Sequence, residues 1–141
     1  MNSSSRFTVA IHVLTLLAYA GPDPLTSEYI AGSVTTNPVV IRRLLASLRV
    51  AGLVRSQGGP GGGWQLLREP RRITLRDVLA AVEEAPIFPP PSGIPNPQCP
   101  IGRTIQALLA GPFQSAQAAL DKDLDRTTIA ALVAQARAAH A

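Results

Sequence analysis

The stretch NPVVIRRLLASLRVAGLVRSQGGPGGGWQLLREPRRITLRDVLAAVE, Asn37 to Glu83, decides the fold of this chain. Asn37 is a preferred helix cap, and Pro38 at the first helical position gives up no hydrogen bond, so a helix is predicted to begin here. Four aliphatic residues then repeat at intervals of three and four, which is typical of a helix with one buried face: Ile41, Leu44, Leu45 and Leu48. The helix is predicted to run through Arg49 and to stop at Ala51-Gly52.

Two short β-like runs follow, Leu53–Ser56 and Gly63–Leu67, and they flank a glycine-rich segment. Runs of this kind on either side of glycines pair as a hairpin with a loose tip. Downstream, Thr74 and Asp77 resemble a capping box for a helix from Arg76 to Glu84. A recognition helix, a hairpin and a further helix in this order predict a winged helix-turn-helix, in which the hairpin is the wing.

Two more helices are predicted on the N-terminal side of this stretch. Apolar residues from Phe7 to Ala20 fall at roughly helical spacing, and a Gly/Pro cluster at 21–24 ends the segment. Thr26 or Ser27 then offers an N-cap for a short helix that continues to Val34. The fold class is therefore mainly α with a small β-hairpin wing.

The C-terminal part of the chain is set apart by prolines. Seven of them lie between Ala85 and Pro100, which is enough to stiffen a connection and too many for regular structure. We therefore divide the chain into a winged helix-turn-helix DNA-binding domain at 1–84, a Pro-rich connecting loop at 85–100 and a helical dimerisation region at 101–141.

An apolar stripe with helical spacing runs through the dimerisation region, and it is expected to be interrupted or kinked at Gly111-Pro112. Its members are Ile105, Leu108, Leu109, Phe113, Ala116, Leu120 and Leu124. Thr127 or Thr128 can cap a final helix from Ile129 to Ala139. Because little of the chain remains to cover this apolar stripe, it needs a partner, and the same stripe on a second copy is the simplest one. The sequence therefore predicts a homodimer through these C-terminal helices.

Arginines dominate the charge of the decisive stretch. Between Asn37 and Arg76 there are eight of them, against a single carboxylate, Glu69. The whole chain has a formal net charge of +4 and a pI near 10.2, yet 16% of its residues are charged, so the basic character is clustered. Clustering of this kind favours a nucleic-acid partner, here double-stranded DNA.

The remaining composition narrows the class of protein further. Hydrophobic residues make up 46% of the chain and aromatic residues 4%, which favours helices over a β-sandwich. The single cysteine, Cys99, excludes an internal disulfide framework and an all-cysteine metal site within one chain. There is neither an apolar run of 18 residues nor a credible signal-peptide cleavage site. We expect a cytoplasmic protein with no membrane segment.

The DNA contacts follow from the predicted elements. A helix fits the major groove, arginines pair with guanine edges or phosphates, and a wing can lie along the neighbouring minor groove. The first turns of the recognition helix would read or position the major groove, later arginines would meet phosphates or the minor groove, and wing glycines would let the backbone approach. The predicted DNA-binding residues are Thr26, Ser27, Pro38, Val39, Arg42, Arg43, Arg49, Arg55, Gly59, Gly61 and Gly62.

Each of these features also has a plainer interpretation. Taken alone, Arg42 or Arg43 could equally be a solvated arginine on an ordinary helix. The wing tip could be a disordered surface loop, and Trp64 is expected to face the core rather than to stack on bases. The competing hypothesis for the whole chain is a winged-helix module that docks a protein partner, although a face so rich in one sign of charge argues against it.

Residues that could support catalysis or hold a metal are sparse. His12 lies in the apolar first helix and His140 lies next to the C-terminus, and neither has an obvious nucleophile or carboxylate partner in the sequence. Three aspartates alternate near a helix end but lack the glycine and terminal glutamate of a calcium loop: Asp121, Asp123 and Asp125. We expect no catalytic residue, no metal site, no cofactor and no enzyme activity.

The segment NPVVIRRLLASLRVAGLVRS followed by GGPGGGWQLLREPRRITLRDVLAAVEE resembles the bacterial transcription regulators of the Rrf2 family, which includes iron-sulfur, nitric-oxide and cysteine-metabolism regulators. The resemblance spans nearly the whole chain. It implies a dimeric winged-helix regulator, with the second and third helices and the wing on DNA and a long helix forming the dimer. The expected function is sequence-specific DNA binding by a homodimer on a palindromic operator, as a repressor.

Cluster-binding members of that family carry three cysteines in the loop before the dimer helix, where this chain offers Cys99 alone. The chain therefore resembles the clusterless branch, and NPQCPIGR, residues 96–103, is similar to the stretch that opens the dimer helix there. Cys99 could be a thiol-based redox sensor, since a helix start and nearby Arg103 would lower its pKa, or it could be a small buried residue. A small-molecule effector has no sequence signature.

Overall fold

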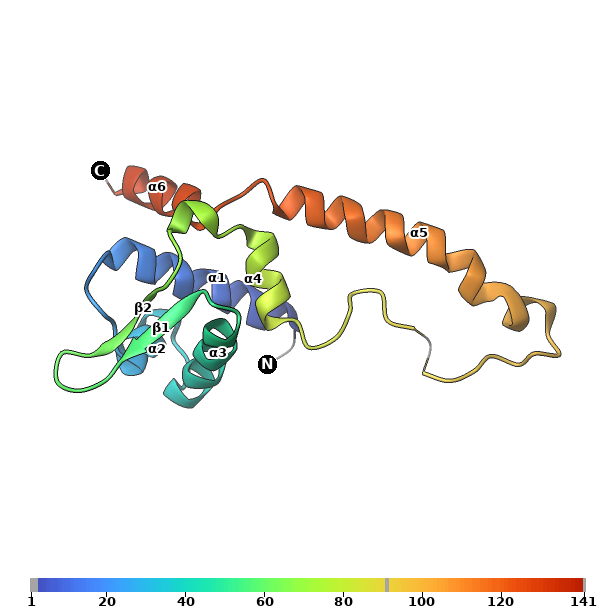
Figure 1. Ribbon diagram of the computed structural model, residues 1–141, viewed down its shortest axis with the longest axis horizontal. Coiled ribbons are helices and arrows are strands. Elements are labelled where there is room, and N and C mark those ends of the chain that lie inside the picture. The colour runs from blue at the N-terminus through green and yellow to red at the C-terminus, as the bar shows by residue number, and fades with distance from the viewer. Residues whose placement is uncertain (1–2, 91, 141) are drawn as a thin grey trace.

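A computed structural model describes residues 3–90 and 92–140 (Figure 1). Within these ranges the chain forms α-helices, one antiparallel hairpin and a single 3-10 turn. Their bounds are α1 Ser3–Ala20, α2 Ser27–Val34, α3 Pro38–Val50, β1 Val54–Gln57, β2 Gly63–Leu66, η1 Pro70–Arg72, α4 Leu75–Val82, α5 Pro100–Leu124 and α6 Ile129–Ala139. The prediction of a mainly α fold with a small hairpin is confirmed.

The core is built from aliphatic side chains of α1, α2, α3, α4 and α6 and of the segment that leads into β1. The predicted buried face of α3 is confirmed, because all four of its aliphatic residues are fully buried. The largest fully buried side chains are Val13, Leu14, Leu17, Ile30, Ile41, Leu44, Leu45, Leu48, Leu53, Val54, Ile73 and Ile129.

Side-chain caps fix where the helices begin. Thr26, rather than Ser27, caps α2, and its hydroxyl accepts from the N–H of Tyr29 at 3.1 Å. Asn37 caps α3 and accepts from the N–H of Val39 at 2.8 Å. These bonds satisfy N–H groups that have no partner inside their helices. The recognition helix therefore starts where the sequence predicts.

A backbone bridge holds the wing against the start of α2. In the hairpin Val54 pairs with Leu66 and Gln57 pairs with Gly63. Beyond it, Leu25 exchanges hydrogen bonds with Trp64 at 3.0 and 2.7 Å. The three segments thus form a small sheet-like unit beside α2.

Helix α6 belongs to the body of the molecule rather than to a separate arm. It packs on α1 (Figure 1), and its Ile129 is fully buried in the common core. The backbone on either side of Thr74 pairs with that around Thr128: Leu75 N–H donates to the Thr127 carbonyl at 3.0 Å, and Ile129 N–H donates to the Ile73 carbonyl at 2.9 Å. The three-part division of the chain stays a prediction, but its last part is not uniform, since only α5 projects from the body.

Of the two outcomes predicted at Gly111-Pro112, the interruption is wrong, and the kink stays a prediction. Helix α5 continues through Pro112 without interruption. Proline removes one N–H donor and leaves the carbonyl four residues earlier, that of Leu108, without its partner. Leu108 is exposed, so water can bond to this carbonyl. The helix can therefore tolerate the proline here.

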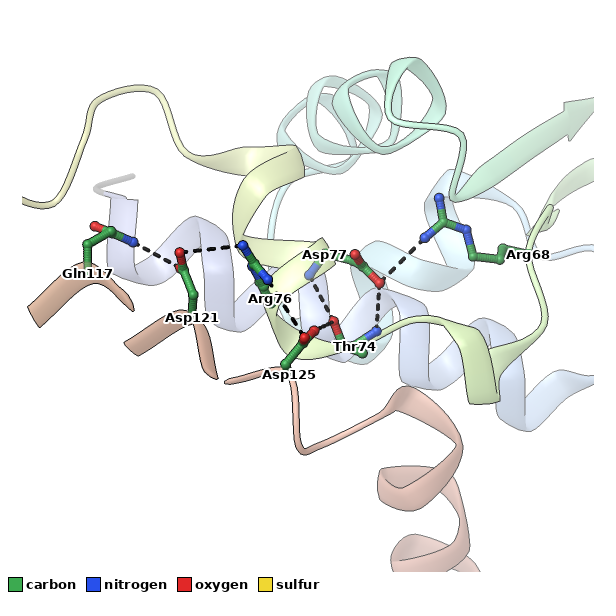
Figure 2. Close-up of polar contacts among 7 residues, drawn as sticks. All are labelled: Arg68, Thr74, Arg76, Asp77, Gln117, Asp121 and Asp125. Atoms are coloured by element: carbon green, nitrogen blue, oxygen red, sulfur yellow. Dashed lines mark hydrogen bonds and ion pairs between the residues drawn. The ribbon is translucent and has the colours of Figure 1, made fainter. Parts of the chain in front are cut away.

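The C-terminal end of α5 is joined to the start of α4 by polar contacts (Figure 2). Arg76 lies between two aspartates, with N···O distances of 3.7 Å to both Asp121 and Asp125. The hydroxyl of Thr74 donates to Asp125 at 3.1 Å. These contacts set the point from which α5 leaves the body.

The same network continues toward the wing through the capping box of α4. The hydroxyl of Thr74 accepts from the N–H of Asp77 at 3.1 Å, and the Asp77 carboxylate accepts from the N–H of Thr74 at 3.0 Å, so the predicted capping box is confirmed. Asp77 also pairs with Arg68, just after β2, at 3.4 Å. A chain of polar contacts thus runs from α5 to the base of the wing (Figure 2).

Candidate nucleic-acid interface

Helix α3 presents a mixed apolar and basic face to solvent. Because its aliphatic residues fill the inner side, residues spaced at three, four and seven positions from Val39 face outward. Val39 is 44% exposed and Val50 is 88% exposed, and Arg43 lies between them on this face. An exposed helix face of this width can enter a major groove.

The predicted DNA-binding arginines have different surroundings. Arg42 forms an ion pair with Glu28 of α2, at 3.3 Å between Nη1 and Oε1. The side chain of Arg43 is exposed and has no ion pair or hydrogen bond to the residues that the structure describes. Arg43 is therefore available to a ligand with no prior contact to break.

Arg49 lies against the wing. Its guanidinium carbon is 5.6 Å from the centroid of the Trp64 ring, which is the geometry of a cation–π contact. Trp64 is half-buried and packs against the core, as expected, but its exposed part also serves as a platform for Arg49. The contact places a positive charge between α3 and the wing.

Arg55 is separated from Arg49 by the hairpin itself. Side chains alternate along a strand, and Val54 faces the core, so its neighbour Arg55 points to the opposite face. Its cross-strand partner is Gln65, whose amide N–H donates to the Pro22 carbonyl. Among the described residues nothing forms an ion pair with Arg55. The two arginines therefore lie on opposite faces of the wing.

The tip of the wing contains a hydrogen-bonded turn. Gly62 N–H donates to the Gly59 carbonyl at 3.0 Å. A side chain at Gly62 would place its Cβ 2.1 Å from the Gln57 carbonyl oxygen, so this glycine is required by the turn. Gly59 and Gly61 have φ of 81° and 74° and open space around them. These two remain free to approach a DNA backbone.

Carboxylates from near and distant parts of the chain pair with much of the arginine cluster. Arg71 and Arg72 pair with Glu69 at 2.7 and 3.8 Å. The hydrogen bond from Arg71 and its charge hold the pKa of the Glu69 carboxyl below its usual value. Arg68 and Arg76 pair with the aspartates already described. With Arg42, five of the eight arginines therefore have a carboxylate partner. The count along the sequence had included only one carboxylate, Glu69.

The other predicted contacts are placed unequally. Ser27 is 8% exposed and faces the core, so we do not carry it forward as a DNA contact. Thr26 is exposed, while Pro38 is half-buried in the first turn of α3. Tyr29, in the first turn of α2, is 61% exposed and was not among the predicted contacts, because nothing in its sequence context separates an exposed tyrosine from a buried one.

The one thiol lies at the start of α5. Cys99 is exposed and occupies the N-cap position of α5, where its side chain forms no capping hydrogen bond. The backbone N–H groups of Gly102 and Ile101 nonetheless lower the pKa of this thiol below its usual value. The cause is the helix start, as expected, while Arg103 makes no such contribution.

A metal or cluster site is not formed by the described side chains. Within 3–90 and 92–140 there is no group of three or more His, Cys, Asp or Glu residues that could hold a metal ion. Iron-sulfur clusters are held by several cysteine thiolates, and this chain has one. The residues therefore do not fit a cysteine-ligated cluster within one chain. None of the described helices meets the length and hydropathy needed to span a membrane.

Comparison with known proteins agrees with this geometry. The Rrf2 family, described as iron-dependent transcriptional regulator, matches residues 3–135. The chain belongs to the Rrf2 family. "Putative HTH-type transcriptional regulator YwnA" of Bacillus subtilis is 39% identical over 121 residues, which cover 86% of this chain and 89% of YwnA. The chain is thus a transcriptional regulator with a DNA-binding fold, and its relatives are regulators rather than enzymes.

Solved structures show the same architecture. CymR, the global cysteine regulator of Bacillus subtilis, superposes with a TM-score of 0.70 and 25% identity over 96% of this chain and 98% of CymR. IscR of T. potens superposes with a TM-score of 0.72 and 24% identity over 100% of this chain and 92% of IscR, which bears on the fold alone. The winged helix-turn-helix prediction is confirmed.

The turn at the wing tip generates a first prediction. Gly62→Ala should open the tip, because the new Cβ cannot lie 2.1 Å from a carbonyl oxygen; strain of this kind is typically about 1–3 kcal/mol. Hydrogen exchange at the Gly62 amide should accelerate. Gly58→Ala is the matched control, because a side chain there meets nothing within 4 Å. Equal exchange in the two variants would contradict this account of the tip.

Proposed function

We propose that this regulator is a repressor that binds a palindromic operator as a homodimer, acting in the cytoplasm and without a conventional iron-sulfur cluster. The observation that carries the proposal is the outward face of α3, where Arg43 is exposed and unpaired beside the apolar Val39. This face belongs to a helix that the core holds in one orientation. A rigid helix with free donors is what sequence readout in the major groove requires.

Each part of the interface has a role in this proposal. Arg43 and Arg42 approach base edges or nearby phosphates from α3, while Val39 offers an apolar contact to a thymine methyl group. Arg49, resting on Trp64, meets the backbone between groove and wing, and Arg55 meets it from the outer face of the wing. Gly59 and Gly61 let the wing backbone lie close to the minor groove. Contacts to phosphates set the register, and contacts to bases supply the specificity.

The homodimer is supported by the exposed apolar side chains of α5. Ile101 is 63% exposed, Leu108 is 60% exposed and Phe113 is 37% exposed, which is unusual for large apolar residues on one helix. A second copy of α5 would cover them through a two-fold interface. Two recognition helices related by that axis would then read two similar half-sites, and an occupied operator that overlaps a promoter would exclude the polymerase.

Arg43→Ala tests the interface. Operator DNA is first recovered by incubating the protein with sheared genomic DNA at near-physiological salt and sequencing what stays bound. If Arg43 reads a base, the variant should lose about 1–3 kcal/mol of binding, confined to one position of each half-site. If Arg43 contacts a phosphate, all sequences should weaken alike and the salt slope should fall by about one.

The control for Arg43 is Arg71→Ala, which removes the same charge from an exposed arginine that already pairs with Glu69. Its effect on operator binding should be several-fold smaller. Absence of any enriched palindrome with the unmodified protein would refute sequence-specific binding under these conditions. Weak dependence of binding on salt would favour a protein-docking module, since phosphate contacts release counterions.

Leu108→Asp tests the dimer. Placing a charge in the apolar stripe should raise the dimer dissociation constant by on the order of 100-fold, since each copy loses a buried leucine. Sedimentation equilibrium measures this directly. Ala107→Asp adds the same charge about a quarter-turn away, on the side of α5 opposite most of the stripe, and should leave the dimer intact. A dimer that survives Leu108→Asp would place the interface elsewhere.

Cys99 carries a second candidate function, a thiol-based redox response. The favouring observation is an exposed thiol whose pKa is lowered by the helix start. Its alkylation by iodoacetamide should therefore reach half-maximal rate at a lower pH than a free cysteine, because the thiolate is the reactive form. Cys99→Ser should abolish labelling. If it leaves the response of DNA binding to peroxide, nitric oxide and electrophiles unchanged, the thiol is not a switch.

A further inference from the structure

The ion pair between α2 and α3 is the one contact in which a carboxylate reaches into the outward face of the recognition helix, among the described residues. Glu28 lies in the first turn of α2, and its Oε1 is 3.3 Å from Nη1 of Arg42. The side chains of Arg42 and Glu28 are 50% and 70% exposed. A pair this exposed contributes little to folding, so stability does not account for it.

The contact leaves one edge of the arginine free. A guanidinium can present two parallel N–H groups either from its two terminal nitrogens or from Nε and Nη2. Glu28 lies at Nη1, so a ligand at the Nη1–Nη2 end would lie beside its carboxylate, whereas the Nε–Nη2 edge does not include the nitrogen that Glu28 contacts. A guanine accepts such a pair of donors through O6 and N7 in the major groove.

The same carboxylate disfavours the competing contact. A phosphate that approached Arg42 would also approach the negative charge of Glu28, and like charges at this range repel. A guanine edge carries no net charge and avoids that repulsion. Arg43 and Arg49, the other arginines of α3, have no carboxylate beside them in the described part of the chain, so either can meet a phosphate without this repulsion.

We propose that Glu28 is a specificity-determining residue, which holds Arg42 for guanine readout and keeps it from binding phosphates without regard to sequence. This inference rests on the proposed function, since it assigns a role within the same DNA interface. It predicts that Arg42 is confined to base readout, whereas Arg43 and Arg49 stay able to contact either a base or a phosphate. Glu28 acts through Arg42 and does not itself need to touch the DNA.

The test compares full-length wild type with Glu28→Gln on two DNA pools, the selected operator with each half-site position varied and random-sequence duplex. Release of Arg42 should raise affinity for random duplex and steepen its salt dependence. The preference for guanine at one half-site position should fall by about fivefold or more. The thermal unfolding midpoint should not change, because the pair is exposed.

Glu83→Gln is the matched control. Glu83 is exposed at the end of α4 and forms no ion pair with the described residues, and its replacement raises the net charge by the same amount. Any general effect of charge on DNA affinity should appear equally in both variants. If Glu28→Gln behaves like Glu83→Gln on both pools, the inference is wrong.

A second comparison, in a variant without Arg42, separates an effect of Glu28 through Arg42 from a direct contact of Glu28 with DNA. In Arg42→Gln, which has no guanidinium at this position, adding Glu28→Gln should leave base preference unchanged. A change that persists there would show that Glu28 reads a base itself, for example by accepting from cytosine, and would overturn the positioning role. A wild-type protein with no sequence preference would refute the proposed function, whereas a specific wild type with an unaffected Glu28→Gln variant would refute this inference alone.

Discussion

Burial of one face of α3 is the constraint on which the rest of the interface depends. Its four aliphatic residues are each 0% exposed. Rotation of the helix about its axis would bring them into water, and a buried leucine or isoleucine is worth about 1.5–3 kcal/mol. The orientation of the helix is therefore fixed by the core before any ligand is present. The side chains of Val39, Arg42 and Arg43 face solvent as a consequence of what lies behind them.

A second constraint links the wing to this helix. The backbone bridge between Leu25 and Trp64 places the β2 strand beside the start of α2, and Trp64 in turn lies beneath Arg49 of α3. Three elements that would approach DNA separately are thereby held in one arrangement. The bridge also needs Gly63, because a Cβ at that position would lie 2.6 Å from the Leu25 carbonyl oxygen. Gly62 and Gly63 thus serve the fold, while Gly59 and Gly61 have open space around them.

Most of the local structure could be predicted from the sequence, because caps and periodicity act between residues a few positions apart. The start of α3 at Asn37, its buried face and the capping box at Thr74 are of this kind. What could not be predicted depends on residues distant in the chain. The apolar pattern of α6 shows that it is buried, but not that α1 rather than a second copy covers it. The interruption predicted at Pro112 is an exception, because the penalty for proline is local, and it failed because an exposed helix tolerates it.

The same distinction applies to the arginines of the interface. A count along the sequence treats all eight as one positive field, whereas the folded chain sorts them by what they contact. Arg68 and Arg76 pair with carboxylates that also bind Thr74, so they join α4 to the wing and to α5. Arg43 and Arg55 have no such partner in the described structure. Because an exposed pair is weak, pairing does not remove an arginine from DNA binding, but it sets which donors and which directions remain. The positions of the unpaired arginines, more than the total number of arginines, therefore determine where this surface can contact DNA.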